Sequence, residues 1–185
     1  MTGNPNQAES SAPRFRLDSY STGTFTRGRS RVVEVLWWIC AGLFVSSGVP
    51  GSRHRRFLLR LFGAKLGRGV VIKPRVRIKF PWRLSVGDHS WIGEAVWIDN
   101  LARVEISSHA VLSQGAYLCT GNHDRKKLTF DLMVAPIYVG PGAWVCAKSC
   151  IGPGVRLGAN VTVGLGAVVT SDIDAGQSVS AGAAS

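Results

Sequence analysis

The chain has 185 residues, of which 45% are hydrophobic, and a formal net charge of +11. This length and apolar content are enough to bury one sizeable core. The 4 cysteines form no CxxC pair and no zinc-ligand spacing, which excludes a zinc-finger class of protein. We therefore expect reduced thiols and a cytoplasmic location.

The N-terminal third predicts a tail and two helices. Residues 1–13 are polar and include two prolines, so we expect a disordered tail. Residues 14–63 form an N-terminal extension. Within it, the apolar stretch 32–49 is borderline for a membrane span, which needs about 20 apolar residues. The segment Arg53–Phe62 predicts a basic amphipathic helix that ends at Gly63.

Two interpretations of residues 32–62 stay open. The helices cover the open end of the domain that follows, or they contact the inner face of the cytoplasmic membrane, where tryptophan and arginine suit the headgroup region. Eleven Arg or Lys residues and no acidic residue lie between Glu34 and Asp88. Such a block attracts polyanions, but the chain has no helix-turn-helix, zinc-finger, RRM or KH signature, so no nucleic-acid partner is expected.

An aliphatic residue recurs at every sixth position near the C-terminus, a period that fits neither an α-helix nor an ordinary β-strand. The same period runs in three shorter series from Leu66 to Leu118. Glycine follows the aliphatic residue at 140, 152, 158 and 164, where we expect a corner with positive φ. This pattern predicts an all-β solenoid over residues 64–185, interrupted by a loop at 119–138. The aliphatic positions are Val139, Val145, Ile151, Leu157, Val163 and Val169.

These repeats resemble the hexapeptide-repeat acyltransferases, whose fold is a left-handed parallel β-helix. The segments GVVIKPRVRIKFPWRLSVGDHSWIGEAVWIDN and VGPGAWVCAKSCIGPGVRLGANVTVGLGAVVTSDI look most like acetyltransferases of colanic-acid and other exopolysaccharide biosynthesis. The loop TGNHDRKKLTFDLMVAPI resembles that of sugar O-acetyltransferases. The resemblance implies direct transfer of acetyl from acetyl-CoA to a sugar hydroxyl of an exopolysaccharide or cell-surface glycan precursor, by a homotrimer.

The resemblance also places His123 at the position of the family's catalytic histidine. A sugar hydroxyl is a weak nucleophile at neutral pH, and a neutral imidazole can take its proton as a general base. Asp124, Asp131 or a backbone carbonyl would orient the ring. Asn100 resembles the polar position that binds the acceptor in related enzymes, and Asp99 is its alternative.

A cofactor site follows from the same resemblance. Trp144 matches a tryptophan that packs beside acetyl-CoA in related enzymes. Ala147, Gly164 and Gly166 are small residues that would line the groove for the pantetheine arm. Lys148 is a candidate cation for the CoA phosphates. No metal is expected.

Other functions remain open. A γ-type carbonic-anhydrase-like metal enzyme would combine His89 and His109 with His123, although the ligands of that class lie closer together in sequence. A non-catalytic, membrane-associated β-helix scaffold would bind neither acetyl-CoA nor a metal. A xenobiotic acetyltransferase would differ only in its acceptor.

Overall fold

The computed structural model describes residues 14–181, which form two compact units. The larger unit contains Thr26–Gly121 and residues 134–181, and the smaller contains residues 14–25 and Asn122–Met133. The extension expected at 14–63 is thus divided, because its helices belong to the larger unit and its first residues to the smaller. The tail expected at 1–13 lies outside the described residues.

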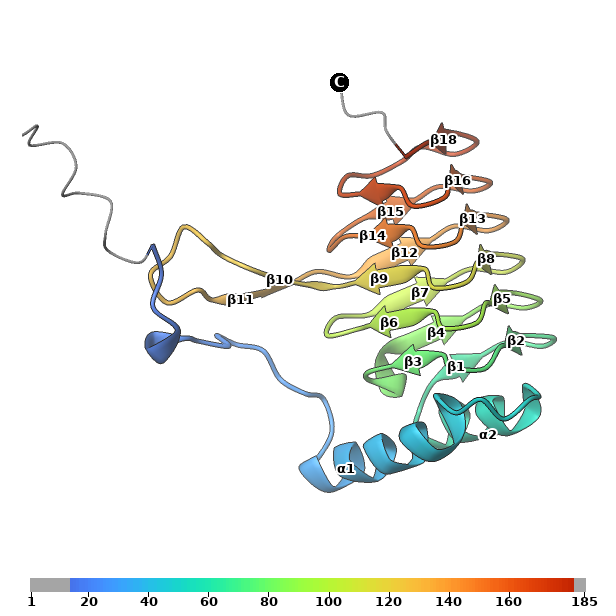
Figure 1. Cartoon of the computed structure of the whole chain (residues 1–185), viewed down its shortest axis with the longest axis horizontal. Helices are drawn as coiled ribbons and strands as arrows, with labels where there is room; N and C mark the ends of the chain where they lie inside the picture. The colour runs from blue at the N-terminus through green and yellow to red at the C-terminus, as the bar shows by residue number, and fades with distance from the viewer. Residues whose placement is uncertain (1–13, 182–185) are drawn as a thin grey trace, which may run out of the picture. The chain divides into compact units, whose positions relative to one another are not determined.

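The larger unit is a solenoid of three parallel sheets, whose short strands stack coil upon coil in Figure 1. The first sheet contains β1 (Lys65–Leu66), β4 (Leu84–Val86), β7 (Val104–Ile106), β12 (Ile137–Val139) and β15 (Arg156–Leu157). The second contains β2 (Val71–Ile72), β5 (Trp91–Ile92), β8 (Val111–Leu112), β13 (Trp144–Val145), β16 (Thr162–Val163) and β18 (Ser178–Val179). The third contains β3 (Arg77–Ile78), β6 (Trp97–Asp99), β9 (Tyr117–Cys119), β14 (Cys150–Ile151) and β17 (Val168–Val169).

The aliphatic residue of each repeat points inward and pairs with its equivalent one coil further on. In the first sheet, Leu66 pairs with Val86, Val86 with Ile106, Ile106 with Val139, and Val139 with Leu157. The last four are at most 3% exposed. Full burial of one such side chain contributes about 1.5–3 kcal/mol, so a column of them stabilises the stack of coils. The predicted solenoid is confirmed.

The glycines that follow the inward residues do not have the conformation expected for them. Positive φ occurs two residues later, at Gly142, Gly154 and Gly166. At Gly158, a Cβ atom would lie 2.5 Å from the backbone nitrogen of Ala175 in the next coil. The expectation of positive φ at 140, 152, 158 and 164 is therefore wrong. Close approach of the neighbouring coil, rather than a left-handed backbone, leaves no room for a side chain at Gly158.

Two helices cover the first coil of the solenoid. Helix α1 (Arg31–Cys40) continues into the π-helical turn η3 (Ala41–Val45), and α2 (Arg53–Leu61) follows. Trp37, Ala41 and Val45 form the buried side of α1 and η3. The indole N–H of Trp37 donates a hydrogen bond of 3.0 Å to the carbonyl of Ile78. This end of the solenoid is thereby covered, as one of the two interpretations of residues 32–62 predicts.

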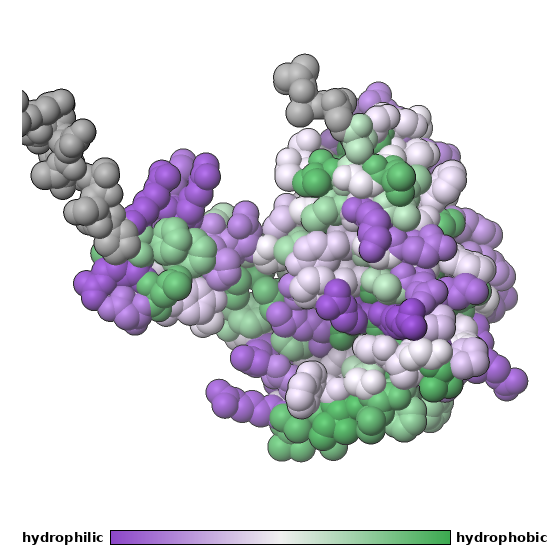
Figure 2. All heavy atoms as spheres, viewed as in Figure 1, coloured by the Kyte–Doolittle hydropathy of each residue, from purple (hydrophilic) through white to green (hydrophobic). Residues whose placement is uncertain are grey.

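The opposite side of α1 and η3 is also apolar, and it is exposed. Val32, Leu36 and Leu43 are 69%, 51% and 62% exposed. Figure 2 shows hydrophobic residues gathered along the helical end of the larger unit, at the lower edge of the view. Among residues 14–181, no helix is long and apolar enough to cross a membrane. A helix that is apolar on both sides but packed on only one leaves a face available to an apolar partner.

Arg55 holds together the connection between η3 and α2. Its side chain is completely buried, and burial lowers the pKa of the guanidinium from its ordinary value. The Nε–H donates to the carbonyl of Val45 at 2.9 Å. The terminal nitrogens donate to the carbonyls of Ser47, Val49 and Gly51. One side chain therefore satisfies four backbone carbonyls in a segment that has no regular hydrogen bonding of its own.

Candidate functional site

The loop that carries His123 replaces one corner of a coil. The chain departs from the solenoid after β9, forms the two-stranded pair β10 (Gly121–His123) and β11 (Leu132–Val134), and returns at β12. In the smaller unit, backbone hydrogen bonds flank the 3-10 turn η2 (Leu17–Ser19): the Arg16 N–H donates to the Leu128 carbonyl, and the Leu132 N–H donates to the Ser21 carbonyl. The N-terminal segment and the loop thus support each other.

The imidazole of His123 is held by Phe130. The two rings stack with centroids 4.5 Å apart and planes 3° apart, and the ring of Tyr20 lies 5.6 Å from that of His123. His123 Nδ1 is 3.2 Å from the Phe130 carbonyl oxygen. Because a carbonyl oxygen can only accept, this contact places the proton on Nδ1 and makes Nε2 the basic nitrogen. In the neutral ring, Nε2 is then the nitrogen that can accept a proton.

The two candidate orienting carboxylates have other hydrogen-bond partners. Asp124 Oδ1 accepts from the backbone N–H of Lys126 at 3.0 Å. Asp131 accepts from the Thr129 hydroxyl at 2.6 Å and from the Lys127 ammonium at 2.9 Å, and these contacts lower the pKa of Asp131. Of the three expected orienting groups, the backbone carbonyl is the one that the geometry supports. The two carboxylates instead stabilise the turn of the loop.

The two candidate acceptor residues have different environments. Asn100 is completely buried, and its side chain pairs with the backbone of Phe80 through Oδ1 (2.9 Å) and Nδ2 (2.6 Å). Asn100 therefore has a structural role in holding the corner before η4 (Pro81–Arg83). The Asp99 carboxylate lies on the outer face of β6, 3.1 Å from the Lys79 ammonium and 3.4 Å from the Tyr117 hydroxyl. The Asp99 side chain is 15% exposed and its Oδ1 is buried, so Asp99 is the less buried member of the pair.

The expected cofactor residues gather on adjoining parts of the solenoid. Trp144 is 50% exposed on β13, and its indole N–H donates to the hydroxyl of Ser113 at 2.9 Å. At the next corner, the Gly166 N–H donates to the Ala147 carbonyl at 3.0 Å, so these two small residues lie on adjacent coils. A Cβ on Gly166 would meet nothing within 4 Å, which leaves open space at this corner.

The remaining two cofactor candidates have structural explanations of their own. The exposed Lys148 occupies the same corner as Ala147 with φ of 61°, and its side chain packs over Gly115. A Cβ on Gly164 would lie 2.9 Å from the carbonyl oxygen of Val179. The close approach of the next coil therefore explains Gly164 without a ligand.

The histidines of the alternative metal site form no metal-binding group in this structure. The rings of His89 and His109 stack 5.4 Å apart at successive coils, where both residues have positive φ. Across residues 14–181, no three His, Cys, Asp or Glu side chains are arranged to hold a metal ion.

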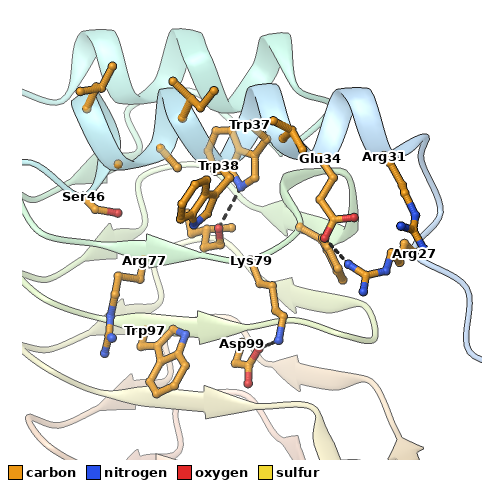
Figure 3. A pocket seen from close by; sticks show the side chains of 17 residues that line it. Arg27, Arg31, Glu34, Trp37, Trp38, Ser46, Arg77, Lys79, Trp97 and Asp99 are labelled. Carbon is orange, nitrogen blue, oxygen red and sulfur yellow. Dashed lines mark hydrogen bonds and ion pairs between the residues drawn. The ribbon is translucent and has the colours of Figure 1, made fainter. Parts of the chain in front are cut away.

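A cleft of about 950 Å³ lies between α1 and the outer faces of β3 and β6. In Figure 3, Trp38 points from α1 toward the strands. Arg77 and Lys79 project from β3 and the residue that follows it, and Trp97 and Asp99 project from β6. The candidate acceptor residue Asp99 is therefore part of the wall of this cleft. The repeat pattern does not reveal the cleft, although it does align Arg77 with Trp97, which pair on the neighbouring strands β3 and β6.

Two proteins of Escherichia coli are similar to this chain in sequence. It is 40% identical over 149 residues to the colanic acid biosynthesis acetyltransferase WcaF of Escherichia coli K12, covering 80% of this chain and 82% of that protein. It is 25% identical over 122 residues to the galactoside O-acetyltransferase of the same organism, covering 64% of this chain and 60% of that protein. No family model matches the chain.

Solved structures agree on the fold. The hexapeptide-repeat acetyltransferase VCA0836 of Vibrio cholerae, in complex with acetyl coenzyme A, superposes with a TM-score of 0.73 at 23% identity, covering 89% of this chain and 92% of that one. A galactoside acetyltransferase in complex with coenzyme A gives 0.73 at 20% identity, covering 80% and 76%. At these identities the likeness shows the fold alone. The class is that of the left-handed β-helix proteins built from hexapeptide repeats.

The sequence relationship is more specific than the fold. At 40% identity over most of both chains, this protein belongs to the family of hexapeptide-repeat acetyltransferases that includes WcaF. The resemblance stated from the sequence is confirmed.

Proposed function

We propose that this protein transfers an acetyl group from acetyl-CoA to a sugar hydroxyl of an exopolysaccharide or cell-surface glycan precursor. The family relationship supports acetyl transfer, and the loop that carries His123 supports general-base catalysis. The single observation that carries the proposal is the hydrogen-bond geometry of His123, whose Nδ1 faces a carbonyl oxygen at 3.2 Å and whose Nε2 is therefore basic. Related proteins are named as a colanic acid acetyltransferase and a galactoside O-acetyltransferase.

The proposed reaction is a direct transfer. His123 Nε2 takes the proton of the acceptor hydroxyl as its oxygen attacks the thioester carbonyl carbon. The tetrahedral intermediate then collapses, the carbon–sulfur bond breaks, and the thiolate of CoA takes the proton from Nε2. The imidazole returns to its starting tautomer, because the Phe130 carbonyl stabilises the proton on Nδ1 throughout. The acceptor would lie against Asp99, and acetyl-CoA along Trp144, Ala147 and Gly166 with Lys148 near its phosphates.

The test of this mechanism replaces His123 by Ala. We expect the rate of thiol release from acetyl-CoA, measured with a panel of alkyl glycosides, to fall by about 10²–10⁴-fold, the usual contribution of a general base. Acetyl-CoA binding, measured by calorimetry, should not change. Glu105→Gln is the control, because Glu105 pairs with Arg103 elsewhere on the solenoid. A folded wild-type protein that does not bind acetyl-CoA would refute the function. An unchanged rate in the variant would refute the role of His123.

The proposal extends to assembly and location. We propose a homotrimer with active sites between subunits, for which sedimentation equilibrium should give about three times the chain mass of 19.8 kDa. We also propose a cytoplasmic protein that makes peripheral contact with the inner face of the membrane through residues 32–62. The exposed apolar side of α1 and the cations around it support this contact.

A further inference from the structure

The cleft beneath α1 has two chemically different walls (Figure 3). Beyond Arg31 and Glu34 at its start, the α1 wall is apolar and includes Val35, Trp38 and Ile39, all of which are about half exposed or more. The wall formed by β3 and β6 carries charged side chains. The volume of about 950 Å³ lies within the range of about 300–1,000 Å³ of ordinary small-molecule sites. The cleft is therefore large enough for an amphipathic ligand.

The charges in the cleft leave two cations unpaired. Four cations and two carboxylates line it. Glu34 is ion-paired with Arg27, and Asp99 with Lys79. Among the ion pairs of residues 14–181, none involves the other two cations, Arg31 and Arg77. The cleft therefore has an excess positive charge that an anion would neutralise.

Arg77 is held in place by a stack of aromatic rings. Its guanidinium carbon lies 4.2 Å from the centre of the Trp97 ring, and Trp97 stacks on Tyr117 with centroids 4.5 Å apart. Stacking fixes the plane of the guanidinium and leaves its N–H groups free to bind a planar or tetrahedral anion in a bidentate way. The Tyr117 hydroxyl in turn donates a hydrogen bond of 3.4 Å to Asp99 Oδ2. One continuous surface thus joins the anion-binding position to the proposed acceptor position.

We propose that the cleft binds the carrier part of the acceptor, and that this carrier is a lipid phosphate. The sugar would lie at Asp99, the phosphate at Arg77, and the first part of the alkyl or isoprenoid chain against Val35, Trp38 and Ile39 of α1. The inference rests on the proposed function, because it identifies the substrate class of that enzyme. Charge complementarity selects the phosphate, and the apolar helix wall selects a lipid over a soluble sugar phosphate.

The test uses decyl phosphate below its micellar concentration and follows tryptophan fluorescence, since Trp38 and Trp97 line the cleft. We expect saturable binding of decyl phosphate, and much weaker binding of decanol or inorganic phosphate. Arg77→Gln should weaken decyl phosphate binding by about tenfold to a hundredfold, the usual effect of losing a charge-assisted contact. Arg156→Gln is the matched control, because Arg156 stacks on Tyr138 at 4.8 Å on another sheet and does not line the cleft.

A second variant blocks the cleft sterically. Gly42 lines the cleft, and a Cβ there would meet nothing within 4 Å, so Gly42→Leu introduces a bulky side chain at a position where the backbone accepts a Cβ. This variant should also lose decyl phosphate binding. Equal binding by the wild type, Arg77→Gln and Gly42→Leu would overturn the proposal, as would equally tight binding of decanol.

Two further measurements distinguish a failure of the lipid-phosphate site from a failure of the proposed enzyme function, and a glycan carrier from an ordinary phospholipid. Acetyl-CoA affinity should be the same in Arg77→Gln as in the wild type, so a failure of the lipid-phosphate site is distinguishable from a failure of the enzyme assignment. If ordinary phospholipid headgroups occupied the cleft instead, Arg77→Gln would weaken binding to phosphatidylglycerol vesicles as strongly as binding to decyl phosphate. That result would overturn the assignment to the acceptor.

Discussion

Arg55 illustrates how a single residue can have a role opposite to its sequence pattern. In the sequence it is one of several cations that follow an apolar stretch, and such cations usually face water or a membrane surface. In the structure it is buried and donates to four carbonyls of the segment between η3 and α2. The hydrogen-bonding needs of an irregular backbone segment explain its burial.

We predict that Arg55→Met destabilises the protein by about 3 kcal/mol or more, because the change removes four hydrogen bonds from a charged donor and leaves the carbonyl of the buried Val45 without its partner. Urea unfolding at a fixed protein concentration measures the effect, since oligomerisation makes stability depend on concentration. Arg53→Met is the control, because Arg53 is exposed at the start of the same helix. Equal unfolding midpoints for the two variants would contradict the assigned role of Arg55.

At the scale of the element, the hexapeptide period predicts which residues form the coils but not why each glycine is present. The period of six follows from inward side chains that repeat once per face, a local pattern that can be seen in the sequence of a solenoid. The distance between one coil and the next depends on residues that are far apart in the sequence, as the pairs Leu66–Val86 and Val139–Leu157 show. For Gly158 that distance, rather than the local backbone, excludes a side chain.

A pair of glycine variants separates these two causes. Gly158→Ala should destabilise the solenoid by about 2–3 kcal/mol, since its Cβ would overlap the next coil. Gly166→Ala has open space but a φ of 68°, so it should cost only about 1 kcal/mol. Gly48→Ala, with open space and no positive φ, should change the unfolding midpoint little. A larger effect at Gly166 than at Gly158 would show that backbone strain dominates.

At the scale of the whole molecule, the larger unit combines a covered end with an exposed apolar face. The same helix, α1, packs on the first coil through one side and exposes Val32 and Leu36 on another. Capping and membrane contact are thus compatible, because they use different sides of one helix. The peripheral contact proposed above therefore predicts a specific effect of substitutions on the exposed side.

We predict that Val32→Asp combined with Leu36→Asp weakens binding to phosphatidylglycerol-containing vesicles by about a hundredfold or more, since each buried aliphatic side chain contributes about 1.5–3 kcal/mol. Vesicle co-sedimentation measures this. Neither residue lines the cleft, so decyl phosphate binding should survive. Leu165→Asp, which alters an equally exposed leucine on a distant coil, is the control. Vesicle binding that both substitutions leave unchanged would contradict the membrane contact.

The solenoid, its inward residues and the family can all be predicted from the sequence, because the period of six and the segments that resemble hexapeptide-repeat acetyltransferases are visible along the chain. The sequence also identified His123 as the candidate base. The three-dimensional structure was needed to see that the Phe130 carbonyl faces the His123 ring, that Asn100 is fully buried while Asp99 is partly exposed, and that α1 forms one wall of a cleft. Each of these depends on contacts between residues far apart in the chain or on burial, which a linear pattern does not encode.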